Sequence, residues 1–100
     1  MSNIRHNPKR DANETRIVRE LEQLGFKVIR INQANIPDLL VMHPRGGMVL
    51  VEVKTKRGRL SPGQEAEIAD ILDHGGEAFT ARCTSDVLRA FGMIEEANGG

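Results

Sequence analysis

Two apolar runs separated by a short turn constrain the fold more than any other feature of the sequence. Asp38–Met42 (DLLVM) and Met48–Lys54 (MVLVEVK) have the length and composition of strands, and the HPRGG segment between them contains proline and two glycines. This pattern predicts a β-hairpin. A loop of three residues, 44–46, pairs Met42 with Met48, and a loop of five gives the same register. Both loops place Asp38 opposite Glu52, whereas a loop of four would turn Glu52 to the other face.

The predicted pairing brings two carboxylates together within a run that is otherwise apolar. Directly opposed residues lie about 4.5–5.5 Å apart at Cβ, and two acids at that distance repel unless a cation lies between them. Lys54 follows Glu52 by two residues and shares its face of the strand. Two interpretations are open from the residues alone. The acids are oxygen ligands of Mg²⁺ or Mn²⁺, or Lys54 neutralises one of them in a structural ion pair.

The remaining periodicity predicts the element order α-β-β-β-α-β-α in one α/β domain, a sheet flanked by helices. The other expected elements are a helix over about 12–24, a strand over 26–31, a polar connection over 32–37, a helix after Ser61 that ends at Gly75–Gly76, a strand over 77–82, and a last helix N-capped within 84–86. Residues 1–11 are expected to be a flexible basic arm, 12–95 a single domain, and 96–100 a flexible tail.

Composition excludes several classes of function. The apolar run Leu39–Met42 is too short to span a bilayer, and the sequence has neither a phosphate-loop glycine signature nor a Gly-x-Ser-x-Gly motif, so we expect no membrane partner and no nucleotide cofactor. Only three residues are aromatic, which argues against a surface for stacking single-stranded bases. The single cysteine, Cys83, excludes an internal disulfide and is typical of a cytoplasmic protein. We expect it to be a buried core residue.

Charge is balanced over the chain but not along it. Residues 1–60 carry 12 basic and 6 acidic side chains, and residues 61–100 carry 2 basic and 8 acidic ones. This asymmetry favours one basic surface that would suit a phosphate backbone, although such charges also solvate ordinary surfaces. The candidate DNA-binding residues are Lys56, Arg57 and Arg59 in the loop after Lys54, and Lys9 and Arg10 in the arm. Gly58 would let the backbone of that loop approach a phosphate, and an ordinary solvated loop is the alternative.

Two further polar residues have alternative roles. Glu14 precedes Ile17, Val18 and Leu21 at helical spacing, which would direct it toward the site, but 11–14 (DANE) also matches a capping box. Gln64 falls in the first turn after Ser61. It would hold a water molecule or a phosphate at that helix N-terminus, or it would face solvent.

These residues together resemble a known nuclease family. Pro37-Asp38, then thirteen residues, then Glu52-Val53-Lys54 resembles the PD-(D/E)XK nuclease signature. The run VEVKTKRGRLSPGQ is similar to the virus-type replication-repair nucleases (VRR-NUC), in the small stand-alone form known from phages and bacteria. The resemblance extends over about residues 13–88, and it implies the restriction-endonuclease-like αβββαβ core of that superfamily.

The resemblance implies a role for each candidate residue. Asp38, Glu52 and the Val53 carbonyl would bind Mg²⁺, with Mn²⁺ able to replace it. Lys54 would orient the attacking water, Glu14 would complete the site, and Gln64 would be the motif glutamine. The implied activity is a structure-selective DNA endonuclease that resembles Holliday junction resolvases and acts as a homodimer. The alternatives are a non-catalytic DNA-binding module on the same fold, a nuclease that reads a specific sequence, and an unrelated α/β structural protein.

Overall fold

The computed structural model describes residues 8–92, and in that range three helices pack on one four-stranded sheet. The elements are α1 (Pro8–Gln23), β1 (Lys27–Arg30), β2 (Leu39–Met42), β3 (Met48–Val53), α2 (Pro62–Asp73), β4 (Ala78–Ala81) and α3 (Thr84–Ala90). The strand order is β1-β2-β3-β4, with antiparallel pairing from β1 to β3 and β4 parallel to β3. The predicted element order and the sheet flanked by helices are confirmed. No helix within 8–92 is long and apolar enough to cross a membrane.

The hairpin forms with a loop of three residues, one of the two lengths that give the predicted register. The His43 amide donates to the Gly47 carbonyl at 2.9 Å, and the Gly46 amide donates to the His43 carbonyl at 2.9 Å. Gly46 and Gly47 have φ values of 106° and 93°, a region that residues with a Cβ rarely occupy. The ladder runs from Met42 opposite Met48 to Leu39 opposite Val51. The next pair in this register is Asp38 and Glu52, as the sequence predicted.

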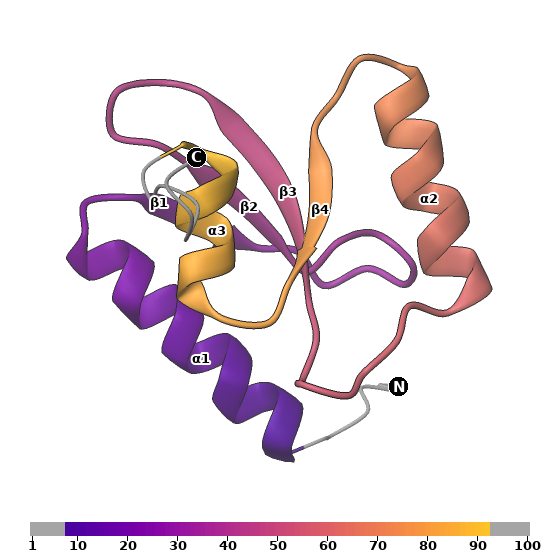
Figure 1. Ribbon diagram of the computed structural model, residues 1–100, viewed down its shortest axis with the longest axis horizontal. Helices are drawn as coiled ribbons and strands as arrows, with labels where there is room; N and C mark the ends of the chain where they lie inside the picture. Colours follow the sequence, from indigo (N-terminus) through magenta and orange to yellow (C-terminus); the bar gives the residue numbers. More distant parts are fainter. Residues whose placement is uncertain (1–7, 93–100) are drawn as a thin grey trace, which may run out of the picture.

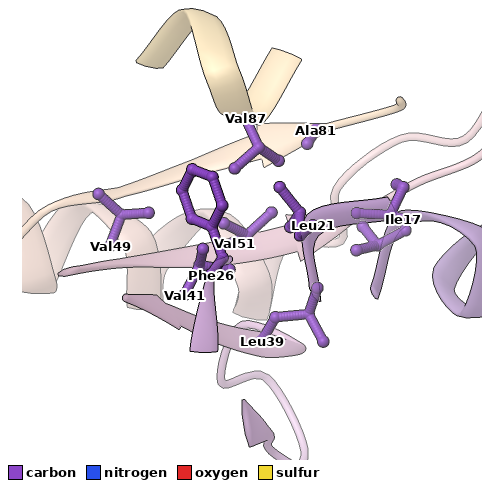
Figure 2. Close-up of a cluster of buried hydrophobic side chains, with 10 residues drawn as sticks. Ile17, Leu21, Phe26, Leu39, Val41, Val49, Val51, Ala81 and Val87 are labelled. Carbon is purple, nitrogen blue, oxygen red and sulfur yellow. The ribbon is translucent and has the colours of Figure 1, made fainter. Parts of the chain in front are cut away.

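The helices divide between the two faces of the sheet. α1 and α3 lie on one side and α2 on the other (Figure 1). The apolar core fills the space between the sheet and the α1–α3 layer, where side chains from all these elements point toward one another (Figure 2). Its labelled members are Ile17, Leu21, Phe26, Leu39, Val41, Val49, Val51, Ala81 and Val87. This core fixes the strand ends from which the site residues project.

Helix α1 begins earlier than the sequence predicted. It starts at Pro8 rather than near residue 12, so the last part of the expected arm is helical. Proline is pre-organised for the first turn of a helix and needs no amide partner there, which is the property that the prediction overlooked. The C-terminal end is as expected, because Gly25 has φ 94° and the Phe26 amide donates to the Leu21 carbonyl. Residues 1–7 of the expected arm and the expected tail 96–100 lie outside the described residues.

Two predictions near the start of α3 are wrong. The N-cap is Cys83, and the expected cap residues 84–86 form the first turn of the helix instead. The Asp86 carboxylate accepts a hydrogen bond from the Arg82 backbone amide at 2.9 Å. Its side chain therefore binds an amide of the turn before the helix rather than an amide of the helix. Cys83 is exposed, not buried, because it lies in this turn between β4 and α3.

Candidate active site

The candidate site lies where several elements end at the same edge of the sheet. β3 ends at Val53, β4 ends at Ala81 beside it, and β2 begins one residue after Asp38. The first turn of α2 and the loop 54–61 lie at this same end (Figure 1). The sheet therefore gathers residues that are up to 26 positions apart in the sequence, from Asp38 to Gln64.

Asp38 is held at the start of β2 by its backbone and its carboxylate. Pro37 is fully buried, and the Ile31 amide donates to the Asp38 carbonyl at 2.7 Å. The Asp38 Oδ2 atom accepts from the Val53 amide at 2.8 Å. The carboxylate therefore lies against the backbone of β3, next to the residue that follows Glu52.

Glu52 is the one charged side chain buried among the residues described, with 1% of its surface exposed. The Lys54 Nζ lies 3.7 Å from Glu52 Oε2, and the Lys54 side chain is itself only 11% exposed. Taking a carboxylate out of water costs several kcal/mol unless cations and hydrogen bonds compensate. The ion pair supplies part of that compensation, and it places an ammonium group beside the Glu52 carboxylate.

Gln64 connects the N-terminus of α2 to this buried acid. Its Nε2 donates to Glu52 Oε2 at 3.1 Å, and its Oε1 accepts from the Ser61 amide at 2.9 Å. The Gln64 amide in turn donates to Ser61 Oγ at 3.2 Å, which completes a capping box. The predicted cap at Ser61 is confirmed, and the Gln64 side chain contacts Glu52 rather than facing solvent. Both ends of its side-chain amide are engaged, so its orientation toward Glu52 is fixed.

Glu14 approaches the same edge of the sheet from the other layer. Ile17 and Leu21 are buried, so the inward stripe that contains Glu14 is confirmed. The capping box over 11–14 is not formed, because α1 starts at Pro8 and Glu14 lies within the helix. Glu14 Oε2 lies 3.5 Å from the Arg30 Nε, and Arg30 is opposite Leu39 in the sheet. The structure thus places Glu14 beside Arg30 at the end of β1.

Asn13 is a residue of this region that the sequence analysis missed. Its Nδ2 donates to the Lys54 carbonyl at 2.9 Å and to the Arg82 carbonyl at 3.3 Å. The Arg82 guanidinium donates to the Thr55 carbonyl at 2.9 Å. These contacts tie the backbone that leaves β3 to α1 and to the end of β4. Asparagine is unfavourable inside helices, so its presence at an inward-facing position of the predicted helix was the sequence signal that could have identified Asn13.

We expect Asn13→Ala to lower the free energy of unfolding by about 1–3 kcal/mol, because two carbonyl groups lose their donor. Urea denaturation measures this change. Asn32→Ala is the matched control, since Asn32 is exposed in the 32–37 connection and its replacement should change stability by less than about 0.5 kcal/mol. Equal effects of the two substitutions would contradict the bridging role of Asn13.

The candidate DNA-binding residues whose side chains the structure describes lie in the loop beside the site. Lys56, Arg57 and Arg59 lie in the loop that follows Lys54, and all three are exposed there. The loop folds back on itself, since the Gly58 amide donates to the Thr55 carbonyl at 3.0 Å and a Cβ at Gly58 would lie 3.3 Å from the Thr55 amide nitrogen. Lys9 and Arg10 are in the first turn of α1, and their side chains lie outside the described residues.

The oxygen-rich donor set of the site fits a divalent cation of the magnesium type. The Asp38 and Glu52 carboxylates are the next pair in the β2–β3 register beyond Leu39 and Val51. Hard cations such as Mg²⁺ and Mn²⁺ prefer carboxylate and carbonyl oxygens. Among the side chains that the structure describes, those of residues 12–92, no group of three histidine, cysteine or acidic residues is arranged to hold a metal ion. Asp38, Glu52 and a backbone oxygen beside them are the groups that would hold such a cation.

Comparison with known proteins identifies the family. The VRR-NUC domain family matches residues 5–85. A solved structure of a VRR_NUC domain is similar to this chain, with a TM-score of 0.71 and 26% sequence identity over 86% of this chain and 97% of that one. No curated protein matches the sequence.

The fold and the family match define a protein of a nuclease-type class. More closely, the chain belongs to the VRR-NUC domain family. The resemblance drawn from Asp38, Glu52-Val53-Lys54 and the run up to Gln64 is thus confirmed at the level of the family.

Proposed function

We propose that this protein is a metal-dependent, structure-selective DNA endonuclease that hydrolyses phosphodiester bonds. The observation that carries the proposal is the convergence of Asp38, Glu52 and Lys54 at one end of the sheet, with Glu52 buried and the ammonium group 3.7 Å from it. Membership of a nuclease family supports DNA as the substrate. The single cysteine, Cys83, is compatible with action in the cytoplasm.

In this proposal Asp38, Glu52 and the Val53 carbonyl hold Mg²⁺ or Mn²⁺. The cation, when bound, supplies Lewis-acid polarisation of the phosphate. Lys54 orients the attacking water and places a positive charge where negative charge develops on the phosphate oxygens. Gln64 keeps the Glu52 carboxylate in one orientation through its 3.1 Å hydrogen bond. Glu14, held by Arg30, contributes negative charge from the α1 side of the same edge.

The basic loop supplies backbone contacts in this proposal. Lys56, Arg57 and Arg59 follow Lys54 closely, so a strand whose phosphate reaches the site passes over them. Contacts of this kind bind without reading sequence and are sensitive to salt. Two symmetric cuts on a four-way junction need two active sites, which a homodimer would supply.

We expect Arg57→Ala to weaken DNA binding equally for different sequences and to reduce the slope of log affinity against log salt concentration by about 0.9. Fluorescence anisotropy at several salt concentrations measures the slope. Arg89→Ala is the matched control, since Arg89 lies in the last turn of α3 and pairs with Asp86. An unchanged slope in Arg57→Ala, or the same reduction in Arg89→Ala, would contradict a phosphate contact by the loop.

The activity is tested with labelled four-way junction, fork and linear duplex DNA in Mg²⁺, Mn²⁺ or EDTA. The proposal predicts metal-dependent cleavage of the junction in preference to the linear duplex. Lys54→Ala should remove it, whereas Lys27→Ala, which changes an exposed lysine on β1, should keep the metal-dependent chemistry. Binding of DNA without cleavage would favour the non-catalytic module instead. Cleavage of linear duplex at one defined sequence would favour the sequence-reading nuclease.

A further inference from the structure

The start of the basic loop, residues 55–59, is attached to the rest of the fold through the Thr55 carbonyl. This carbonyl accepts from the Gly58 amide at 3.0 Å and from the Arg82 guanidinium at 2.9 Å. The first hydrogen bond closes the turn of the loop, and the second attaches that turn to the end of β4, which lies at the same end of the sheet (Figure 1). Arg82 follows Thr55 by 27 residues in the chain, so a distant element helps to place the loop.

The backbone of Arg82 is itself held on both sides. Its amide donates to the Asp86 carboxylate at 2.9 Å, and its carbonyl accepts from Asn13 Nδ2 at 3.3 Å. The preceding residue, Ala81, is fully buried and is the partner of Val53 at the end of β4. The arginine side chain therefore extends from a backbone that the sheet, α1 and α3 hold in place.

The turn that Arg82 holds lies close to Lys54. A Cβ at Gly58 would lie 3.2 Å from Thr55 Oγ1 and 3.5 Å from Lys54 Cβ, so the backbone at Gly58 is folded closely over both residues. The three basic side chains of the loop are exposed, and they are the ones for which we propose phosphate contacts. The position of the Thr55 carbonyl therefore determines where those charges lie relative to the site.

The two basic side chains of residues 61–100 are used differently. Arg89 lies 3.1 Å from Asp86, three residues before it on the same helix. Arg82 instead donates to a carbonyl on another segment, and that carbonyl already accepts from the loop. Arginine presents its donors in a rigid planar fork, so less side-chain entropy is lost for each hydrogen bond that it forms. Arg82 is therefore suited to holding a backbone group in place.

We propose that Arg82 is a positioning residue that pre-organises the basic loop for the DNA backbone. It acts through the Thr55 carbonyl, and the side chains of the loop, rather than Arg82 itself, contact the phosphates. A loop that is ordered before binding loses less conformational entropy when DNA binds, which raises affinity without adding a phosphate contact. This inference rests on the proposed function for the DNA, whereas the order of the loop is a property of the free protein.

Limited digestion of the full chain with trypsin, without DNA or metal, tests the order of the loop. Trypsin cuts after lysine and arginine, which the loop contains at three exposed positions. We expect Arg82→Met, which keeps a long side chain but removes its donors, to raise the rate of these cuts about fivefold or more, because local opening exposes a segment to proteolysis. Mass spectrometry of the fragments measures the rate at each position.

Two controls separate the loop from the rest of the fold. Cutting after Arg19, which lies within α1, reports general unfolding in the same digest and should stay at the wild-type rate. Arg89→Met is the matched variant, because Arg89 pairs with Asp86 on α3, and it should leave cutting of the loop unchanged. Unchanged cutting of the loop in Arg82→Met would overturn the proposal, and so would an equal increase after Arg19 or in Arg89→Met.

The salt dependence of DNA binding distinguishes positioning from a direct phosphate contact. In EDTA, Arg82→Met should bind a labelled duplex about threefold or more weakly, because the loop must then be ordered on binding. The slope of log affinity against log salt concentration should stay at the wild-type value, since the number of phosphate contacts is unchanged. A slope reduced by about 0.9 would overturn the proposal in favour of a phosphate contact by Arg82 itself. Failure of the wild-type chain to bind DNA would contradict the proposed function and leave the ordering of the loop by Arg82 standing.

Discussion

Replacing Asp38 with asparagine is expected to abolish cleavage while leaving the fold intact. The asparagine Oδ1 can still accept the hydrogen bond from the Val53 amide, which lies 2.8 Å from Asp38 Oδ2, so the start of β2 keeps its anchor. The substitution removes the negative charge that a cation needs. We expect a loss of activity of about a thousandfold, since a bound cation contributes several kcal/mol to the transition state and about 1.36 kcal/mol is a factor of ten.

Single-turnover cleavage and urea denaturation of the same samples measure the two effects of Asp38→Asn. Asp70→Asn is the matched control, because Asp70 is an acid with a 64% exposed side chain on α2. It should retain wild-type activity. Full activity of Asp38→Asn would show that the carboxylate has no role in catalysis.

The largest effect on stability is expected at Leu21, which is fully buried between α1 and the sheet (Figure 2). Leu21→Ala should lower the free energy of unfolding by about 2–5 kcal/mol, because it removes buried apolar surface and leaves a cavity. A domain of this kind has only about 5–15 kcal/mol of stability in total. The melting temperature should therefore fall by roughly 10 °C or more.

Leu24, which directly follows α1, provides the control for this prediction. It is 51% exposed, whereas Leu21 is 0% exposed. Leu24→Ala should change stability by less than about 0.5 kcal/mol. Similar melting temperatures for the two variants, measured by circular dichroism, would contradict the core assigned to the α1 side of the sheet.

The hairpin shows which parts of the fold are predictable from sequence. The turn composition of HPRGG and the alternation on either side determined the register from Met42–Met48 to Leu39–Val51, and with it the position of Asp38 opposite Glu52. The helix ends at Ser61 and Gly25 were predictable for the same reason, since each depends on a few neighbouring residues. The start of α1 was missed because Pro8 was assigned to an unstructured arm.

Contacts between distant elements were not predictable from local pattern. The sequence indicated that Gln64 begins a helix, but not that its amide reaches Glu52, because that contact depends on how α2 packs on the sheet. The pairing of Glu14 with Arg30 depends in the same way on the position of α1 over β1. The double hydrogen bond of Asn13 to two backbone carbonyls joins three parts of the chain, and only the assembled fold reveals it.

We propose that the buried Glu52 and its neighbours bind a divalent cation. Calorimetric titration of Mn²⁺ into the protein without DNA tests it most directly, with Glu52→Gln as the variant that keeps the side-chain shape and removes the charge. Glu67→Gln on α2 is the control for a change of net charge. We expect Mn²⁺ to bind the wild-type chain and the control, and to bind Glu52→Gln at least tenfold more weakly. Equal binding to all three proteins, or none to the wild type, would contradict a metal site at Glu52.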